Sequence, residues 1–215
     1  MRTGWIGWAF ALLAVAAGPA PARELVPVAA SSAEARPLLD GLRRGGLVMF
    51  FRHADTTGMP CDRSFRVGDR DGQRNISEAG RAQSRRIGAA MAELGVPVEW
   101  PVLAGPVFRA ADTATEAFGG DRVRITDALT ADDFSGSRLD WVLGEHRRLL
   151  SAPVAAGTNR VLVGHRTPAI MVLGDAVGGR ALPEGGAIVL EPATPPRVLG
   201  IVMFAPIPGA GFHGC

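Results

Sequence analysis

Apolar and polar positions follow two different patterns along this chain, and the patterns predict two kinds of element. Short apolar runs bounded by glycine or polar residues are typical of strands buried in a sheet. Such runs occur at residues 47–51, 99–105, 122–126, 159–165, 186–192 and 197–206. The pattern therefore predicts strands spread over most of the chain.

Between these runs lie segments whose apolar spacing and end signals predict helices. They are residues 33–46, 77–95, 106–119, 138–151 and 166–178. The clearest is 77–95, in which Ile87, Met91 and Leu94 fall on one face. Ser77 is suited to cap its first turn, and Gly95 is suited to end it.

This alternation predicts an α/β fold, with a single domain built on a mostly parallel sheet flanked by helices. A chain of 215 residues that is 47% hydrophobic can bury one large core and is short for two. We expect the stretch VPVAASSAEARP, which runs into the first helix, to be a loose lead-in. Residues 59–75 and 128–137 are expected to be loops.

The first 22 residues have the features of a secretory signal peptide. Arg2 precedes an apolar segment at residues 5–17, and Ala20, Pro21 and Ala22 provide a small-residue cleavage site. The apolar segment is shorter than the roughly 20 residues that a membrane span needs. We therefore expect cleavage after Ala22, a domain at residues 23–215, a periplasmic or secreted location and no stable membrane span.

Charge and cysteine content restrict the partners further. The 23 Lys+Arg residues nearly balance the 21 Asp+Glu residues, which gives no support for binding to nucleic acid or to a membrane surface. The two cysteines, Cys61 and Cys215, would reach an oxidising compartment after export. They could form a disulfide or remain two thiols, and the sequence leaves both possibilities open.

Three sets of chemically active residues follow predicted strands. They are Arg52 with His53, Arg109 in the turn after residues 99–105, and His165 with Arg166. In open α/β sheets, ligands bind beyond the carboxyl ends of the strands, so we expect these sets to converge. Histidines gathered with arginines indicate phosphate chemistry, because a guanidinium group can bond two phosphoryl oxygens at once.

Four stretches together resemble the histidine phosphatase superfamily, which has the phosphoglycerate-mutase-like fold. They are FFRHADTTG, RNISEAGRAQSRRIG, VLAGPVFRAADTATEAFG and NRVLVGHRTPAI. Their order and spacing match the family, and they extend over about residues 47–174. The resemblance implies the family's fold and a phosphatase that needs neither a cofactor nor a metal.

The resemblance also implies roles for individual residues. His53 would be the nucleophile that becomes phosphorylated, Arg52 and Arg109 would bind the phosphoryl oxygens, and His165 would bond a further oxygen. Nearby guanidinium groups disfavour an imidazolium, so His53 can stay neutral and keep a lone pair for attack. The alternatives are a core or surface histidine at residue 53, a solvated arginine at 109 and a helix cap or core histidine at 165.

The general acid departs from the family pattern. Ala131 stands where one branch of the family has a glutamate, and Arg166 stands where another branch has its acid. The remaining candidates are the adjacent Asp132 and Asp133, and Asp55 near the nucleophile. We assign the acid to Asp132 or Asp133, with Asp55 as a third possibility and a solvated turn as the alternative for the pair.

The leading interpretation is an exported phosphatase that acts on a small phosphorylated substrate. The resemblance makes an envelope sugar phosphate, such as one in the lipopolysaccharide core, a candidate substrate. A phospho-ligand-binding protein without catalysis is the alternative, and export disfavours a phosphoglycerate mutase. Residues 67–78 fit a calcium loop only in part, because Val67 occupies the first ligand position. We expect His146 on a solvated helix face, and we assign no catalytic role to Arg74 or His213.

Overall fold

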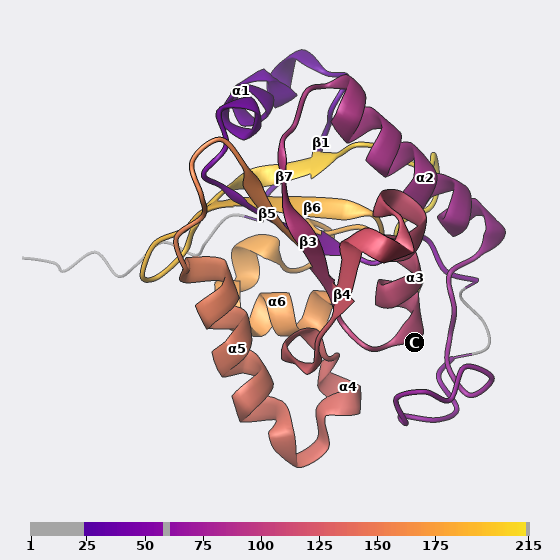
Figure 1. The fold of residues 1–215 in the computed structure, drawn as a ribbon. Coiled ribbons are helices and arrows are strands. Elements are labelled where there is room, and N and C mark those ends of the chain that lie inside the picture. Colours follow the sequence, from indigo (N-terminus) through magenta and orange to yellow (C-terminus); the bar gives the residue numbers. More distant parts are fainter. Residues whose placement is uncertain (1–23, 58–60, 214–215) are drawn as a thin grey trace, which may run out of the picture.

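The computed structural model describes residues 24–57 and 61–213 (Figure 1). The predicted signal peptide and Cys215 lie outside these residues. A seven-stranded sheet forms the centre of the described chain. Its strands are β1 (Val28–Ala29), β2 (Val48–Arg52), β3 (Val98–Ala104), β4 (Val123–Ile125), β5 (Asn159–Gly164), β6 (Gly186–Glu191) and β7 (Arg197–Met203).

The sheet has the order β1-β7-β6-β2-β5-β3-β4. β2, β5, β3 and β4 pair in parallel, whereas β6 is antiparallel to both of its neighbours, β2 and β7. Within the described residues β6 alone opposes the other strands, so the prediction of a mostly parallel sheet is confirmed. The prediction of a loose lead-in before the first helix was wrong in part, because Val28 and Ala29 form β1 beside β7. A strand of two residues is too short for a sequence pattern to reveal it.

Helices cover both faces of the sheet, which gives three layers (Figure 1). α1, α2 and α3 pack on one face against Met49 and Phe51, and α5 and α6 pack on the other against Val48 and Phe50. β2 is buried throughout because it lies between these layers. The helices are α1 (Arg36–Arg44), α2 (Glu78–Glu93), α3 (Phe108–Phe118), α4 (Asp132–Ser135), α5 (Leu139–Ser151) and α6 (Arg166–Leu173).

Two glycines allow α2 to pack closely on its neighbours. A Cβ atom on Gly80 would lie 2.1 Å from the carbonyl oxygen of Asp55, and one on Gly88 would lie 1.9 Å from that of Ala117. No side chain fits at either distance. α2 is therefore held directly against the segment that follows β2, two residues beyond His53.

The predicted start of α2 is confirmed, and two other predictions need correction. The Ser77 side chain accepts the amide of Gly80, at 2.8 Å, as an N-cap does. Residues 128–137, expected as a loop, contain part of a 3-10 turn (Asp127–Leu129) and the short helix α4. α6 ends at Leu173, earlier than predicted, because Gly174 has a φ of +83° that a helix does not allow.

The expectation for His146 was wrong. This residue is fully buried on α5, where its Nδ1 bonds the carbonyl of Val142 at 2.9 Å. Its ring lies 5.9 Å from that of Phe50 on β2. The flanking arginines suggested a solvated position, but this face of α5 packs on the sheet. In the described ranges, no helix is long and apolar enough to cross a membrane.

Candidate active site

His53 and His165 lie side by side because the strands that precede them are neighbours. β2 and β5 pair in parallel, with Arg52 opposite Gly164. The next residue on each strand is a histidine, and the amide of His53 donates to the Gly164 carbonyl at 3.0 Å. The two ring centroids are 5.5 Å apart. The sheet thus brings both predicted histidines together at its carboxyl edge, where α/β folds bind ligands.

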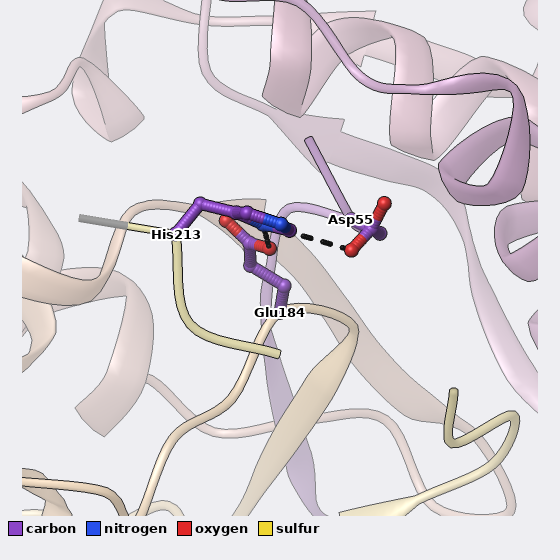
Figure 2. A group of neighbouring side chains, drawn as sticks. All are labelled: Asp55, Glu184 and His213. Carbon is purple, nitrogen blue, oxygen red and sulfur yellow. Dashed lines mark hydrogen bonds and ion pairs between the residues drawn. The ribbon is translucent and has the colours of Figure 1, made fainter. Parts of the chain in front are cut away.

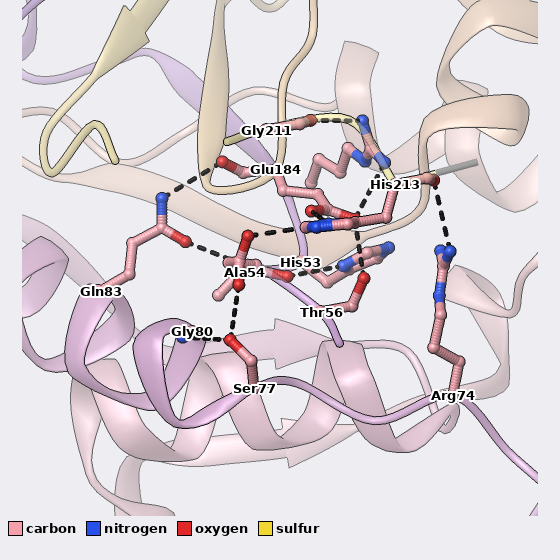
Figure 3. Close-up of polar contacts among 12 residues, drawn as sticks. His53, Ala54, Thr56, Arg74, Ser77, Gly80, Gln83, Glu184, Gly211 and His213 are labelled. Carbon is pink, nitrogen blue, oxygen red and sulfur yellow. Dashed lines mark hydrogen bonds and ion pairs between the residues drawn. The ribbon is translucent and has the colours of Figure 1, made fainter. Parts of the chain in front are cut away.

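A hydrogen bond fixes the tautomer of His53 (Figure 3). Its Nδ1 lies 2.9 Å from the carbonyl oxygen of Ala54. A carbonyl oxygen can only accept, so Nδ1 carries the proton and Nε2 keeps the lone pair. Burial holds the pKa of His53 well below its usual range, and the charges of Arg52 and Arg109 act in the same direction. The ring is therefore neutral at physiological pH.

Arg52 ends β2 and is held by fixed partners. Its Nη1 donates to the carbonyls of Leu182 and Gly211, at 3.1 and 3.3 Å, and its Nη2 pairs with Glu184 at 3.2 Å. Burial lowers the pKa of Arg52 to about 10, although the charge of Glu184 opposes the shift. The group stays charged at neutral pH. Its buried Nε has no hydrogen-bond partner in the described chain, so this donor is available to a ligand.

Arg109 lies in the first turn of α3, just after β3, which neighbours β5. Its Nη1 pairs with Asp62 at 3.1 Å. Burial lowers the pKa of Arg109, and the charge of Asp62 opposes this shift. Its Nε is also buried without a partner among the described residues. Gly105 allows the turn before α3 to pack closely, because a Cβ atom there would lie 2.2 Å from the carbonyl oxygen of Leu129.

His165 occupies the N-cap position of α6, yet its side chain makes no capping hydrogen bond. The helix-cap alternative therefore does not apply. Burial holds the pKa of His165 well below its usual range, with a further contribution from Arg109. Its buried Nε2 lacks a hydrogen-bond partner in the part of the chain that the structure describes.

A cavity of about 390 Å³ is lined by the four residues described above, Arg52, His53, Arg109 and His165. Five arginines and three aspartates are among its lining residues, so its field is positive and suits an anion. The lining residues to which the sequence assigned no role are Asp62, Arg74, Arg166, Thr167, Gly179, Arg180, Phe212 and His213. Arg74 and Arg166 lie within the recognised motif stretches, which could have drawn attention to them. No sequence signal marks Arg180 or Phe212.

The structure separates the three candidates for the general acid. Asp132 and Asp133 begin α4 and line the cavity. Burial raises the pKa of Asp132, and the neighbouring charge of Asp133 raises it further. Asp55 lines a different cavity and accepts a hydrogen bond from the Ser77 hydroxyl. Asp132 is therefore the carboxyl group best placed to carry a proton at this site.

The last described residues include Phe212 and His213, which line the cavity, and Figure 3 shows the polar contacts of Gly211 and His213. The carbonyl of Gly211 accepts from Arg52, and that of His213 accepts from Arg74 Nη1 at 3.3 Å. The ring of Phe212 has its centroid 5.3 Å from Cζ of Arg52. Residues 211–213, here called the tail, are thus tied to two arginines of the cavity.

The segment that carries Asp62 and Arg74 begins at Cys61, which is disulfide-bonded. Of the two possibilities left open by the sequence, an unpaired thiol is therefore excluded for Cys61. Cys215, the other cysteine of the chain, lies outside the described residues.

Asp55, Glu184 and His213 are the one group of potential metal ligands within the described residues (Figure 2). One donor atom from each lies within 4.8 Å of the others. Two carboxylate oxygens and an imidazole nitrogen form a donor set that a cation such as zinc accepts. However, His213 Nδ1 already lies 2.8 Å from Glu184 Oε2, and Glu184 Oε1 accepts from Thr56 at 3.0 Å. We therefore interpret this group as the anchor of the tail.

Comparisons with known proteins were made on sequence and on structure. No protein-family model matches this chain, and no curated protein matches its sequence. The protein histidine phosphatase SixA complexed with tungstate is similar with a TM-score of 0.50 at 13% identity, over 74% of this chain and 97% of that chain. A mycobacterial glucosyl-3-phosphoglycerate phosphatase complexed with inorganic phosphate gives a TM-score of 0.45 at 20% identity, over 72% of this chain and 94% of that chain.

A further solved structure, mycobacterial hydrolase 1, gives a TM-score of 0.47 at 19% identity, over 79% of this chain and 100% of that chain. Identities this low show a likeness of fold alone. The prediction of a phosphoglycerate-mutase-like α/β fold, as in the histidine phosphatases, is confirmed.

Proposed function

We propose that this chain, which has the fold of the histidine phosphatases, hydrolyses a phosphomonoester through a phosphohistidine at His53. The observation that carries the proposal is the state of His53, which is buried and neutral with its proton on Nδ1. Its Nε2 lone pair belongs to a ring that lines a cavity with five arginines. These cations can neutralise the charge of the substrate without protonating the nucleophile.

In the first step, Nε2 of His53 attacks phosphorus and the bond from phosphorus to the ester oxygen breaks. The leaving oxygen takes a proton from Asp132, whose raised pKa keeps that proton available. Arg52 and Arg109 bind the equatorial oxygens, using the Nε donors that are unpartnered in the described chain. His165 donates a hydrogen bond to a further oxygen.

In the second step, water attacks phosphorus and the bond from phosphorus to Nε2 breaks. The Asp132 carboxylate accepts a proton from this water. Phosphate leaves, His53 regains its lone pair and Asp132 is again a carboxylic acid. Protons and bonds therefore balance over the two steps.

The substrate and the location belong to the same proposal. A cavity of about 390 Å³ is in the range of small-molecule sites, which supports a small phosphorylated substrate. The predicted signal peptide at residues 1–22 supports export, and an envelope sugar phosphate is the candidate that the sequence resemblance offers. The fractionation of cells that produce the full chain tests the location.

The function is tested by hydrolysis of para-nitrophenyl phosphate in the presence of EDTA. Because nitrophenolate leaves without an acid, the assay measures the nucleophile and the arginines apart from Asp132. We expect His53→Ala to lower kcat by about 10⁴-fold or more. His146→Leu removes another buried histidine that does not line the cavity, and this control should retain most of the activity.

Two results would contradict the proposal. Activity that persists in His53→Ala, or that EDTA abolishes, would require another nucleophile or a metal. An inactive wild-type protein that still binds phosphate would instead support the phospho-ligand-binding alternative.

A further inference from the structure

The cavity holds more positive charge than one phosphoryl group needs. Arg52 and Arg109, the proposed phosphoryl-binding arginines, are each paired with a buried or nearly buried carboxylate. The other three cavity arginines are Arg74, Arg166 and Arg180. Across residues 24–57 and 61–213, no carboxylate oxygen lies within 4.0 Å of their guanidinium nitrogens.

Arg166 and Arg180 belong to one part of the cavity wall. Arg166 begins α6, and its Nη2 donates to the carbonyl of Gly179, next to Arg180. The Nε of Arg166 is buried and has no partner in the described chain. A guanidinium group presents its donors as a planar fork, so this unsatisfied donor marks a place for an oxygen ligand.

The ring of Phe212 lies near both Arg180 and Arg52, and so relates the position of Arg180 to that of the phosphoryl site. Its centroid lies 4.8 Å from Cζ of Arg180 and 5.3 Å from Cζ of Arg52. The two guanidinium carbons are therefore at most about 10 Å apart. A compact molecule can reach both.

The arginines of the cavity repel one another. Burial is the main cause of the lowered pKa of Arg52, and the charges of Arg166, Arg74 and Arg109 lower it further. A second anionic group would relieve this repulsion, whereas a neutral substrate group would leave it in place. Water can hydrate the guanidinium group of Arg180, which is exposed, but it does not reach the buried Nε of Arg166.

We propose that Arg166 and Arg180 bind a second anionic group of the substrate, a phosphate or a carboxylate, in the same cavity as the phosphoryl group. This inference rests on the proposed phosphatase function. It defines the substrate class as small phosphomonoesters that carry another anion. Arg74, whose Nη1 is bonded to the tail, is not needed for this contact.

The test compares three substrates that share one ring. Phenyl phosphate carries the phosphoryl group alone, 4-carboxyphenyl phosphate adds a carboxylate, and 1,4-phenylene bisphosphate adds a phosphate. The measured quantity is the preference, defined as kcat/KM for a doubly charged substrate divided by kcat/KM for phenyl phosphate. We expect the wild type to prefer at least one doubly charged substrate by about 10-fold or more, equivalent to about 1.4 kcal/mol.

Arg166→Gln and Arg180→Gln should each reduce this preference by about 10-fold, approaching a ratio of one. Arg147→Gln removes one positive charge from the exposed surface of α5, outside the cavity, and should keep the wild-type preference. The thermal midpoint of each variant is measured first, and the exposed Arg180 provides the variant least able to disturb folding. The larger of the two wild-type preferences identifies the second group as carboxylate or phosphate.

A wild type without preference, or a preference that survives both substitutions, would overturn the inference. Calorimetric binding of phenylphosphonate and 4-carboxyphenylphosphonate, which are not hydrolysed, keeps the two proposals apart. A chain that hydrolyses no ester but binds the carboxyphenyl compound more tightly, through Arg166 and Arg180, would retain the second-anion site and lose the phosphatase function. Hydrolysis of the esters without any difference in binding between the two phosphonates would retain the phosphatase function and exclude the second-anion site.

Discussion

The two ends of the cavity are built in different ways. The inner end consists of Arg52, His53, Arg109 and His165, and the outer rim consists of Asp132, Arg166, Arg180 and Phe212. Every inner residue is at most 5% exposed and either ends a strand, follows one directly or lies in the first turn of a helix after one. The rim residues are half-buried or exposed, and they come from the first residues of α4 and α6, the loop before β6 and the tail.

This difference separates the groups that act on the phosphoryl group from those that act on the rest of the substrate, including its leaving oxygen. The inner end is fixed by the pairing of β2 with β5 and by α3, so its geometry depends on the core of the sheet. The rim can change without disturbing that pairing, because its residues lie in loops, in the tail or at the first residues of helices, outside the strands. We therefore expect substitutions at the inner end to affect every phosphomonoester, and substitutions at the rim to affect particular substrates.

After the loss expected in His53→Ala, the largest expected effect tests the inner end through Arg109. Arg109→Gln removes a charged donor from the proposed phosphoryl site, so kcat/KM should fall by about 10²- to 10³-fold. The loss should be similar for para-nitrophenyl phosphate and for phenyl phosphate, because both carry the same phosphoryl group. Steady-state kinetics on the two esters measure it.

Arg148→Gln is the matched control for this substitution. Arg148 is also paired with a carboxylate, that of Glu145, but this pair is exposed on α5 and does not line the cavity. Surface pairs of this kind contribute little to stability, and its loss should leave kcat/KM unchanged. A loss in Arg109→Gln that is confined to one ester would place Arg109 with the rim instead.

The contrast also explains what the sequence could predict. His53 and His165 follow buried apolar runs, and strands of a parallel sheet end at the same edge. The convergence of these two histidines was therefore predictable from the sequence alone. Ser77 and the glycines of α2 were also visible as motif residues, although their close contacts with Asp55 and Ala117 were not.

Asp132 and Arg166 of the rim were named from the sequence, whereas Arg180 and Phe212 were not predictable, for a physical reason. Arg180 and Phe212 lie in segments without periodicity, and their positions depend on long-range contacts such as that of Arg52 with Gly211. Nothing in the local pattern around residues 174–185 or 211–213 specifies these contacts. The choice of Asp132 over Asp55 likewise depended on which cavity each carboxyl group lines.

The next effect in size tests the rim through Asp132. Asp132→Asn removes the proposed acid but keeps the shape, so hydrolysis of phenyl phosphate should slow by about 10²-fold. Para-nitrophenyl phosphate should be affected far less, because its leaving group needs no proton. Wild-type activity on phenyl phosphate should also fall as the pH rises through the elevated pKa of Asp132, and the variant should lack this alkaline decline.

Asp133→Asn is the control, because Asp133 adjoins Asp132 on α4 and lines the same cavity. Asp133→Asn should slow the hydrolysis of phenyl phosphate less than Asp132→Asn does. The reverse order would assign the acid to Asp133. Equal losses on both esters would show that α4 holds the cavity together and supplies no proton.

The smallest expected effect concerns stability in acid. It depends on the difference in the pKa of the buried histidines between the folded and the unfolded chain. Burial lowers the pKa of His53, His165 and His146 below 6.5 in the folded chain. As the pH falls below 6.5, the unfolded chain takes up these protons first, so the free energy of unfolding decreases by up to about 1.4 kcal/mol per pH unit for each histidine.

His146 contributes to this acid sensitivity from outside the cavity, because it lies on α5 beneath β2 and does not line the cavity, although its charge also lowers the pKa of His165. In His146→Leu, the decrease in unfolding free energy between pH 6.5 and 5 should be smaller than in the wild type, even if the stability at pH 7.5 also changes. Urea unfolding across this range gives the slope. An unchanged slope would mean that His146 binds its proton equally well in both states, and the acid sensitivity would then belong to the inner end alone.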